Sequence, residues 1–164
     1  DRIIWLDTDM LLLRHIPTES NYVSSQYTQQ TGAFKCKKKV VPNIGVMCLD
    51  GKEDIDYDKI LNCKKKPKAF QPKHLKEYEK QVPADLIMGP EVFCPIHWAW
   101  AKELFTSKFF KNQFKYGIAQ KQIEDILPDE NILGVHLWRQ IYNKKKLEIN
   151  DSSVYKQFLN HLNF

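Results

Sequence analysis

The sequence has no run of about 18 or more apolar residues, the length that a membrane-spanning helix needs. It also shows no secretory signal, no internal repeat and no low-complexity tract. None of its four cysteines belongs to a C-x-x-C pair, which argues against a zinc ribbon. What is present is a chain of 164 residues, 43% hydrophobic and 12% aromatic, enough for one globular domain with a buried core.

Lysine gives the chain a net charge of +5, but the basic residues form no single concentrated stripe. Nucleic-acid binding needs such a stripe with aromatic residues between the charges, so we exclude a nucleic-acid partner. Two interpretations of the charge remain: solvated lysine-rich faces, or a basic surface near an anionic ligand such as a nucleoside diphosphate. The lysines form three short groups, at positions 37–39, 64–66 with 68, and 144–146.

Apolar segments alternate with helical patterns along the chain, which predicts an α/β layered domain. Residues 3–6 predict a strand buried on both faces, and a strand so close to the first residue leads us to expect more of the domain upstream. Asp151 or Ser152 is expected to cap the last helix. The other expected strands are 22–27, 40–49, 85–90 and 131–138, and the expected helices are 57–61, 74–80, 119–126 and 150–162.

Two carboxylates, Asp7 and Asp9, follow the first predicted strand directly. Alternate residues of an extended chain point the same way, so the pair offers two oxygen ligands to one point. Strand ends of this kind bind ligands in open α/β sheets, and Mn²⁺ or Mg²⁺ suits oxygen ligands. Such an ion would hold a diphosphate and stabilise its charge as it leaves. The alternative is a turn in which Asp7 caps backbone amides and Asp9 is solvated.

The first strand, the Asp-Thr-Asp triplet and the apolar residues after it resemble the D-x-D core of GT-A glycosyltransferases. Later segments are similar, in the same order, to the α-1,4-glycosyltransferases, a Gb3-synthase-like family with a DXD-containing sugar-binding region. Residues 42–49 resemble the N-x-G/A-x-M strand of several such families, residues 91–98 resemble F-Y-P-I-x-W, residues 134–138 resemble A-V-H-L-W-N, and residues 146–161 follow the closing helix.

The sequence departs from that family at several points. Arg139 stands where the family usually has Asn, Cys94 replaces the usual Tyr, and Phe164 lies near a position that is often Cys. Residues 52–84 lack the G-P-x-x-x-T-R segment. The expected fold is therefore α/β, a GT-A-like mixed sheet flanked by helices, in which residues 1–164 form one partial domain lacking the N-terminal nucleotide-binding strands.

The resemblance implies a metal-dependent, retaining enzyme that moves a hexose or N-acetylhexosamine from a UDP-sugar to a glycan or glycolipid hydroxyl. It also implies the Golgi-lumenal domain of a type II membrane protein, whose anchor would lie upstream of this chain. The implied cofactor is Mn²⁺, or Mg²⁺ in its place. The implied donor-binding residues are Asp7, Asp9, Asn43, Gly45, His136 and Trp138, and Asp7, Asp9 and His136 would hold the metal.

Several residues have a purely structural alternative. His136 is either a metal ligand or diphosphate contact, or a structural histidine hydrogen-bonded to backbone. Trp98 and Trp138 are sugar platforms or core residues. Gly45 allows the sugar to approach or packs tightly against a strand. No carboxylate stands out as a nucleophile.

Two rival functions remain. One is a catalytically inactive glycan- or nucleotide-binding module, and the other is a metal-dependent phosphohydrolase, although no second His/Asp cluster for a hydrolase is evident. Residues 150–152 form an Asn-Asp-Ser glycosylation sequon, which slightly favours a lumenal location.

Overall fold

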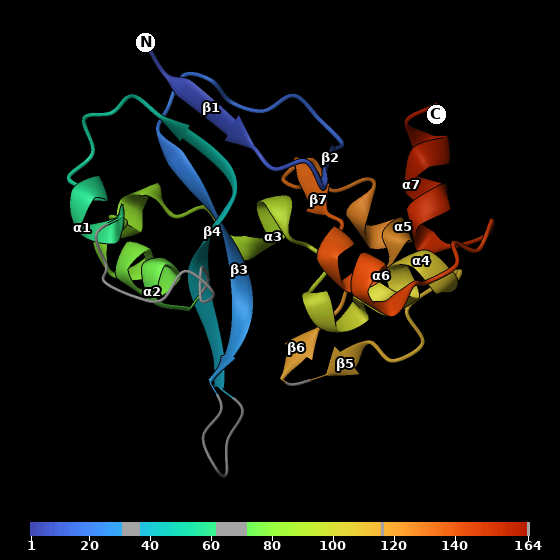
Figure 1. Cartoon of the computed structure of the whole chain (residues 1–164). Coiled ribbons are helices and arrows are strands. Elements are labelled where there is room, and N and C mark those ends of the chain that lie inside the picture. Colours follow the sequence, from blue (N-terminus) through green and yellow to red (C-terminus); the bar gives the residue numbers. More distant parts are fainter. Residues whose placement is uncertain (31–36, 62–71, 116, 164) are drawn as a thin grey trace.

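The computed structural model describes residues 1–30, 37–61, 72–115 and 117–163 (Figure 1). A long antiparallel pair of strands runs through the molecule, with two helices beside it and a lobe of short helices on its other side (Figure 1). The chain is therefore of the predicted α/β class. No helix in the described ranges is long and apolar enough to cross a membrane.

The main sheet contains three antiparallel strands in the order β1-β4-β3. Its central strand, β4, carries Pro42, which cannot donate a hydrogen bond to a neighbouring strand. The pairing with β3 shifts register between Val23 and Ser25, and the buried Ser24 lies at the shift. The Ser24 hydroxyl donates to the Asn43 carbonyl (2.9 Å) and accepts from the Val46 amide (3.0 Å), replacing part of the interrupted ladder. The strands are β1 (Ile3–Leu6), β3 (Tyr22–Gln30) and β4 (Lys37–Leu49).

Strand β1 differs from the sequence-based expectation, because its side chains are exposed. The exposed fractions run from 39% at Leu6 to 77% at Ile3, with Trp5 at 54%. In the described part of the chain, β1 pairs with β4 alone, so it forms an edge of the sheet. The prediction of a strand buried on both faces was wrong, since an apolar strand at an edge has the same composition as one inside a sheet.

A second, shorter ladder joins the turn after β1 to the lobe of short helices. Strand β2 (Met10–Leu12) pairs antiparallel with β7 (Gly134–His136), and Met10 lies opposite His136. The ladder continues past β7, because the Leu137 amide donates to the Asp9 carbonyl (2.8 Å). A third antiparallel pair joins β5 (Phe114–Lys115) to β6 (Ile118–Ala119).

The expected mixed sheet is antiparallel in all the strand pairs of the described residues. A parallel contact does occur, as an isolated bridge between Val23 and Ile87. The expected strand at 85–90 was wrong: Ala84–Leu86 form a 3-10 helix, and the helix α3 (Pro90–Phe93) begins soon after. Pro83 and Pro90 stand at the starts of these two helical turns, positions that suit the fixed φ of proline.

Two helices pack beside the main sheet. They are α1 (Tyr57–Leu61) and α2 (Pro72–Gln81), close to the predicted ranges. Tyr78 of α2 packs with Val23 in a small core cluster, and its hydroxyl contacts the Met47 sulfur at 3.1 Å.

The largest core lies in the lobe of short helices and is built around Trp100, Phe110 and Phe158. The expected helix at 119–126 is shorter in the structure, because residues 118–119 belong to β6 and a Gln122–Asp125 capping box starts the helix afterwards. Ser153, not Asp151 or Ser152, caps the last helix through its hydroxyl. The lobe contains η2 (Trp98–Trp100), α4 (Ala101–Thr106), α5 (Ile123–Ile126), α6 (Arg139–Lys145) and α7 (Val154–His161).

His97 is a buried histidine of this core, with 4% of its surface exposed. Its Nδ1 accepts a hydrogen bond from the Ala99 amide (3.2 Å), and its ring contacts those of Trp98 and Trp100. Burial lowers the pKa of His97 to about 4, against a smaller opposing effect from the Tyr27 backbone. The imidazole is therefore neutral near pH 7.

Two neighbouring phenylalanines test the position of the core. Phe110 is 1% exposed and Phe109 is 52% exposed. We expect Phe110→Ala to lower the free energy of unfolding by about 3–5 kcal/mol, because it leaves a cavity. Phe109→Ala is the matched control and should change it by about 0.5 kcal/mol or less. Denaturant unfolding measures both, and equal losses would contradict this placement of the core.

The buried His97 also predicts a pH dependence of stability. Its folded-state pKa lies below the unfolded value of 6.5, so its contribution is complete above pH 6.5 and is lost as the pH falls towards 4. Between pH 7 and pH 5 the loss should be about 1–2 kcal/mol. His97→Gln should remove this part of the pH dependence in urea unfolding, whereas His15→Gln, at an exposed position, should keep it. The same pH-dependent loss in His97→Gln would refute the assignment.

Candidate functional site

The two aspartates of the triplet lie in a tight turn between β1 and β2. The Met10 amide donates to the Asp7 carbonyl (3.1 Å), which closes the turn, and the Asp7 amide donates to the Gly45 carbonyl of β4 (2.8 Å). The Thr8 amide donates to Asp7 Oδ1 (2.8 Å). The carboxylates converge because of this turn, and not because of the extended geometry expected from the sequence. Asp7 also caps a backbone amide, as the structural alternative proposed.

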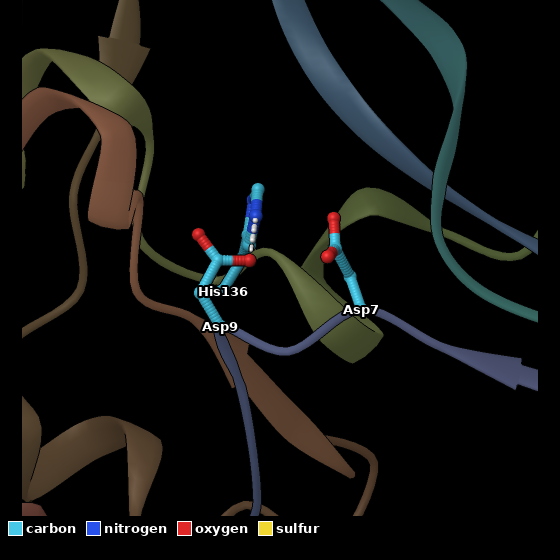
Figure 2. Close-up of side chains that lie close together, drawn as sticks. All are labelled: Asp7, Asp9 and His136. Carbon is cyan, nitrogen blue, oxygen red and sulfur yellow. Dashed lines mark hydrogen bonds and ion pairs between the residues drawn. The ribbon is translucent and has the colours of Figure 1, made fainter.

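Three side chains meet at this turn. Figure 2 shows Asp7, Asp9 and His136 pointing to the same side of the chain, with His136 arriving from β7. One ligand atom from each lies within 4.8 Å of the others. Ligands on opposite sides of Mg²⁺ lie about 4.2 Å apart, so small side-chain rotations would bring all three atoms into one coordination shell. The two carboxylates suit Mn²⁺ or Mg²⁺, whereas an imidazole is more typical of Zn²⁺, Fe²⁺ and other transition metals.

Asp9 is held by two partners. Its Oδ1 lies 3.0 Å from His136 Nε2, and its Oδ2 accepts a hydrogen bond from the Arg139 amide (2.9 Å). Burial raises the pKa of Asp9, but the hydrogen bond and charge of His136 and the Arg139 amide together lower it below the usual value. The side chain is only 12% exposed, as is that of His136. Asp9 is therefore an ionised carboxylate held in place at neutral pH.

The second ring nitrogen of His136 has no protein partner. His136 Nδ1 is buried and has no hydrogen-bond partner among the described residues. A buried polar atom without a partner carries a desolvation penalty of about 1–3 kcal/mol, which only a group bound at Nδ1 itself would relieve. The backbone-bonded histidine of the structural alternative is not what the structure contains, because the partner of Nε2 is a carboxylate.

The three residues face a pocket of about 370 Å³. Five of the six predicted donor-binding residues line it, and Gly45 does not. The pocket walls come from β3, β4, α2, η2, β7, α6 and the turn, so segments far apart in the sequence form them. The lining residues are Asp7, Asp9, Gln26, Pro42, Asn43, Glu79, Trp98, His136, Trp138, Gln140 and Ile141.

Asn43 forms part of the pocket wall, and Gly45 packs against the Asn43 side chain. Asn43 is buried, its Oδ1 accepts from the Gly45 amide (2.6 Å), and its Nδ2 donates to Gln26 Oε1 (2.9 Å). A Cβ on residue 45 would lie 3.0 Å from Asn43 Oδ1 and 3.4 Å from the Met10 sulfur. The structure thus favours tight packing as the reason for glycine at position 45.

Trp138 joins the pocket to the strand that carries His136. Its backbone has the left-handed conformation (φ 54°), which is unusual for a bulky residue. The indole Nε1 donates to the Ile96 carbonyl (2.8 Å), and the ring centroid lies 4.1 Å from that of His136. The next residue, Arg139, donates its amide to the Asp9 carboxylate. The left-handed conformation of Trp138 therefore directs the chain towards the turn that carries Asp7 and Asp9.

Trp98 and three polar residues complete the pocket. Trp98 is 38% exposed and lines the pocket, in contrast to the buried Trp100 two residues later. Gln26, Glu79 and Gln140 also line it, and sequence reasoning missed all three. No sequence signal marks them, because each is an isolated polar residue brought in by tertiary packing.

The charge of the pocket is negative in the described part of the chain. Asp7, Asp9 and Glu79 line it, and none of the lining residues is Lys or Arg. The described lysines therefore fit solvated faces better than a basic binding surface.

Comparison with protein families gives a match. The alpha 1,4-glycosyltransferase conserved region matches residues 65–162, which is more than half of the chain. The matched region includes His136 and Trp138, whereas Asp7 and Asp9 precede it. No curated protein and no solved structure matches the chain. On the family match, this chain belongs to the α-1,4-glycosyltransferase family, and glycosyl transfer is its class of activity.

Proposed function

We propose that this protein transfers a hexose or N-acetylhexosamine from a UDP-sugar to a hydroxyl of a glycan or glycolipid, with retention of configuration. The observation that carries the proposal is the convergence of Asp7, Asp9 and His136 on one pocket in a member of a glycosyltransferase family. Mn²⁺, or Mg²⁺, would bind these three side chains. When bound, the ion supplies charge stabilisation to the departing nucleoside diphosphate.

The charge of the pocket supports a strict need for the ion. Three carboxylates line the pocket, Glu79 among them with Lys39 at 3.9 Å, and none of the described lining residues is Lys or Arg. A diphosphate anion that enters alone would therefore meet the repulsion of Asp7 and Asp9. The two aspartates and the imidazole therefore act as ligands that make the site attractive to an anion only when a divalent cation is present. Because His136 and the Arg139 amide hold Asp9, little reorganisation is needed on binding.

The remaining walls suit a sugar. The exposed face of Trp98 and the ring of Trp138 offer flat apolar surfaces, on which the C–H face of a pyranose packs well. The amides of Gln26 and Gln140 and the carboxylate of Glu79 provide polar groups for hydroxyls. An aromatic wall with a few polar groups is a common arrangement for small ligands.

The family indicates a protein of the secretory pathway. Within that pathway we place the domain in the Golgi lumen, where nucleotide sugars meet glycan and glycolipid acceptors.

Removal of a ligand residue tests the metal-dependent donor site. Asp9→Asn and His136→Ala are each expected to weaken UDP binding in the presence of Mn²⁺ at least about tenfold, or about 1.4 kcal/mol, by calorimetry. Asp85→Asn and His161→Ala are matched controls at exposed positions outside the pocket and should bind as the natural protein does. UDP affinity that is equal with Mn²⁺ and with a chelator would reject the metal site.

A turnover assay tests the transfer reaction itself. The full-length protein is incubated with Mn²⁺ and a panel of UDP-sugars, with and without glycan acceptors, and UDP release is measured. We expect acceptor-dependent release with one or a few donors, reduced about 100-fold or more by Asp9→Asn, because an electrostatic contact to the leaving group is lost.

One other outcome of this assay, and a separate phosphate-release assay, identify the rival functions. Silence over the whole panel with retained UDP binding would show a catalytically inactive binding module. Release of inorganic phosphate from UDP or simple phosphate esters, without sugar transfer, would show a phosphohydrolase.

A further inference from the structure

One short motif lies outside the pocket and has no part in the proposed transfer. Asn150-Asp151-Ser152 occupies the loop between α6 and α7, and all three residues are exposed. The chain has nine asparagines, and Asn150 is the one followed two residues later by Ser or Thr. N-linked glycosylation requires this spacing and a lumenal location. The family indicates the secretory pathway, and the lumenal placement rests on the proposed function.

The local geometry leaves the reactive atom of Asn150 available. Asn150 Oδ1 accepts two hydrogen bonds, from the Ser152 amide and from the Ser152 hydroxyl, both at 2.8 Å. These bonds form an Asx turn, a conformation that three consecutive residues can adopt without help from the rest of the fold. Within the described ranges, Asn150 Nδ2 donates to no protein group.

The loop is anchored by its backbone, and not by the side chain that would be modified. The Asn150 amide donates to the Phe105 carbonyl (2.9 Å), and the Ser153 amide donates to the Asn150 carbonyl (2.9 Å). Ser153 then caps α7. A group attached to Asn150 Nδ2 would therefore disturb neither the helix cap nor the core contact of the loop.

The folded protein has room for a glycan at this position. A hollow of about 450 Å³ beside the loop is lined by Thr106, Glu148, Ile149, Asn150 and Asp151. Ile149 is 38% exposed there, so a first sugar ring has an apolar side chain to cover. None of these residues lines the pocket that holds Asp7, Asp9 and His136, so the two hollows have separate linings.

We propose that Asn150 is an N-glycosylation site and carries an oligosaccharide in the mature protein. The donor class is a polyprenyl-diphosphate-linked oligosaccharide of the secretory pathway, used by its oligosaccharyltransferase. Asn150 Nδ2 forms a bond to C1 of the first sugar, and the bond from C1 to the diphosphate oxygen breaks. The polyprenyl diphosphate leaves with the bonding electrons, and the amide nitrogen loses one proton to the transferase. The step involves no oxidation or reduction.

The test is peptide mass spectrometry on the full-length protein expressed in a eukaryotic cell line. Trypsin releases residues 147–156, a peptide that contains the whole sequon. Treatment with peptide-N-glycosidase in ¹⁸O-labelled water converts a glycosylated Asn150 into labelled Asp. We expect most of this peptide to be labelled in the natural protein and in Ser152→Thr, and none in Asn150→Gln or Ser152→Ala.

Asn143→Gln is the matched control, because Asn143 is an exposed asparagine of the same segment outside the sequon. It should keep the label, and the labelled and unlabelled variants should bind UDP and Mn²⁺ equally. An unlabelled natural peptide, from cells that glycosylate a co-expressed reporter, would overturn the proposal. Label that persists in Ser152→Ala would also overturn it. Because the readout is the label on one peptide, its result does not depend on whether the proposed sugar transfer is correct.

Discussion

The candidate site depends on a ladder of three residue pairs between β2 and β7. Met10 pairs with His136, so the residue before Met10 and the residue that carries the imidazole become neighbours although 127 positions separate them. Gly134 allows the strands to come this close, since a Cβ there would lie 3.1 Å from the Leu11 carbonyl oxygen and 3.3 Å from the Phe93 ring. Without this pairing, the acidic turn and the histidine would belong to separate halves of the molecule.

Several polar contacts extend from that ladder and fix the site. The Leu137 amide binds the Asp9 carbonyl, and the Arg139 amide binds the Asp9 carboxylate. Trp138 stands between them in the left-handed conformation, which costs a non-glycine residue of the order of 1 kcal/mol. The bond from its indole to Ile96 and its contact with His136 offset that cost. Backbone strain at a pocket wall, held by surrounding contacts, is typical of a functional site.

Parts of the fold could be predicted from the sequence because they depend on local pattern. The apolar residues 40–49 predicted most of β4, and the periodic apolar face of 150–162 predicted α7. The exposure of β1 could not be predicted, because only the order of strands in the sheet decides which strand lies at the edge. The strand predicted at 85–90 was wrong for a different reason. Pro83 and Pro90 stand at the starts of helical turns, and a short apolar run does not distinguish such turns from a strand.

The same division applies to the candidate site. Asp7, Asp9 and His136 could be selected because a carboxylate pair after a strand and a histidine in a family-like segment are visible in the sequence. The structure brings them together through a turn rather than an extended pair, so the expected geometry was wrong, and their role as metal ligands stays a prediction. Gln26, Glu79 and Gln140 could not be found, since their place at the pocket follows from packing between distant segments.

The candidate metal ligands come from two different parts of the fold, so binding of a cation would be coupled to the contact between these parts. The acidic turn precedes the family-conserved region, whereas His136 and Trp138 lie inside it, at the edge of the lobe of short helices. The two sides are joined by a short ladder and by the contacts of α3 with β3, β4 and β7. A cation bound to Asp7, Asp9 and His136 would bind only the arrangement in which the ladder is formed. Its binding free energy would therefore add to the stability of the contact between sheet and lobe, and would hold the pocket walls in register.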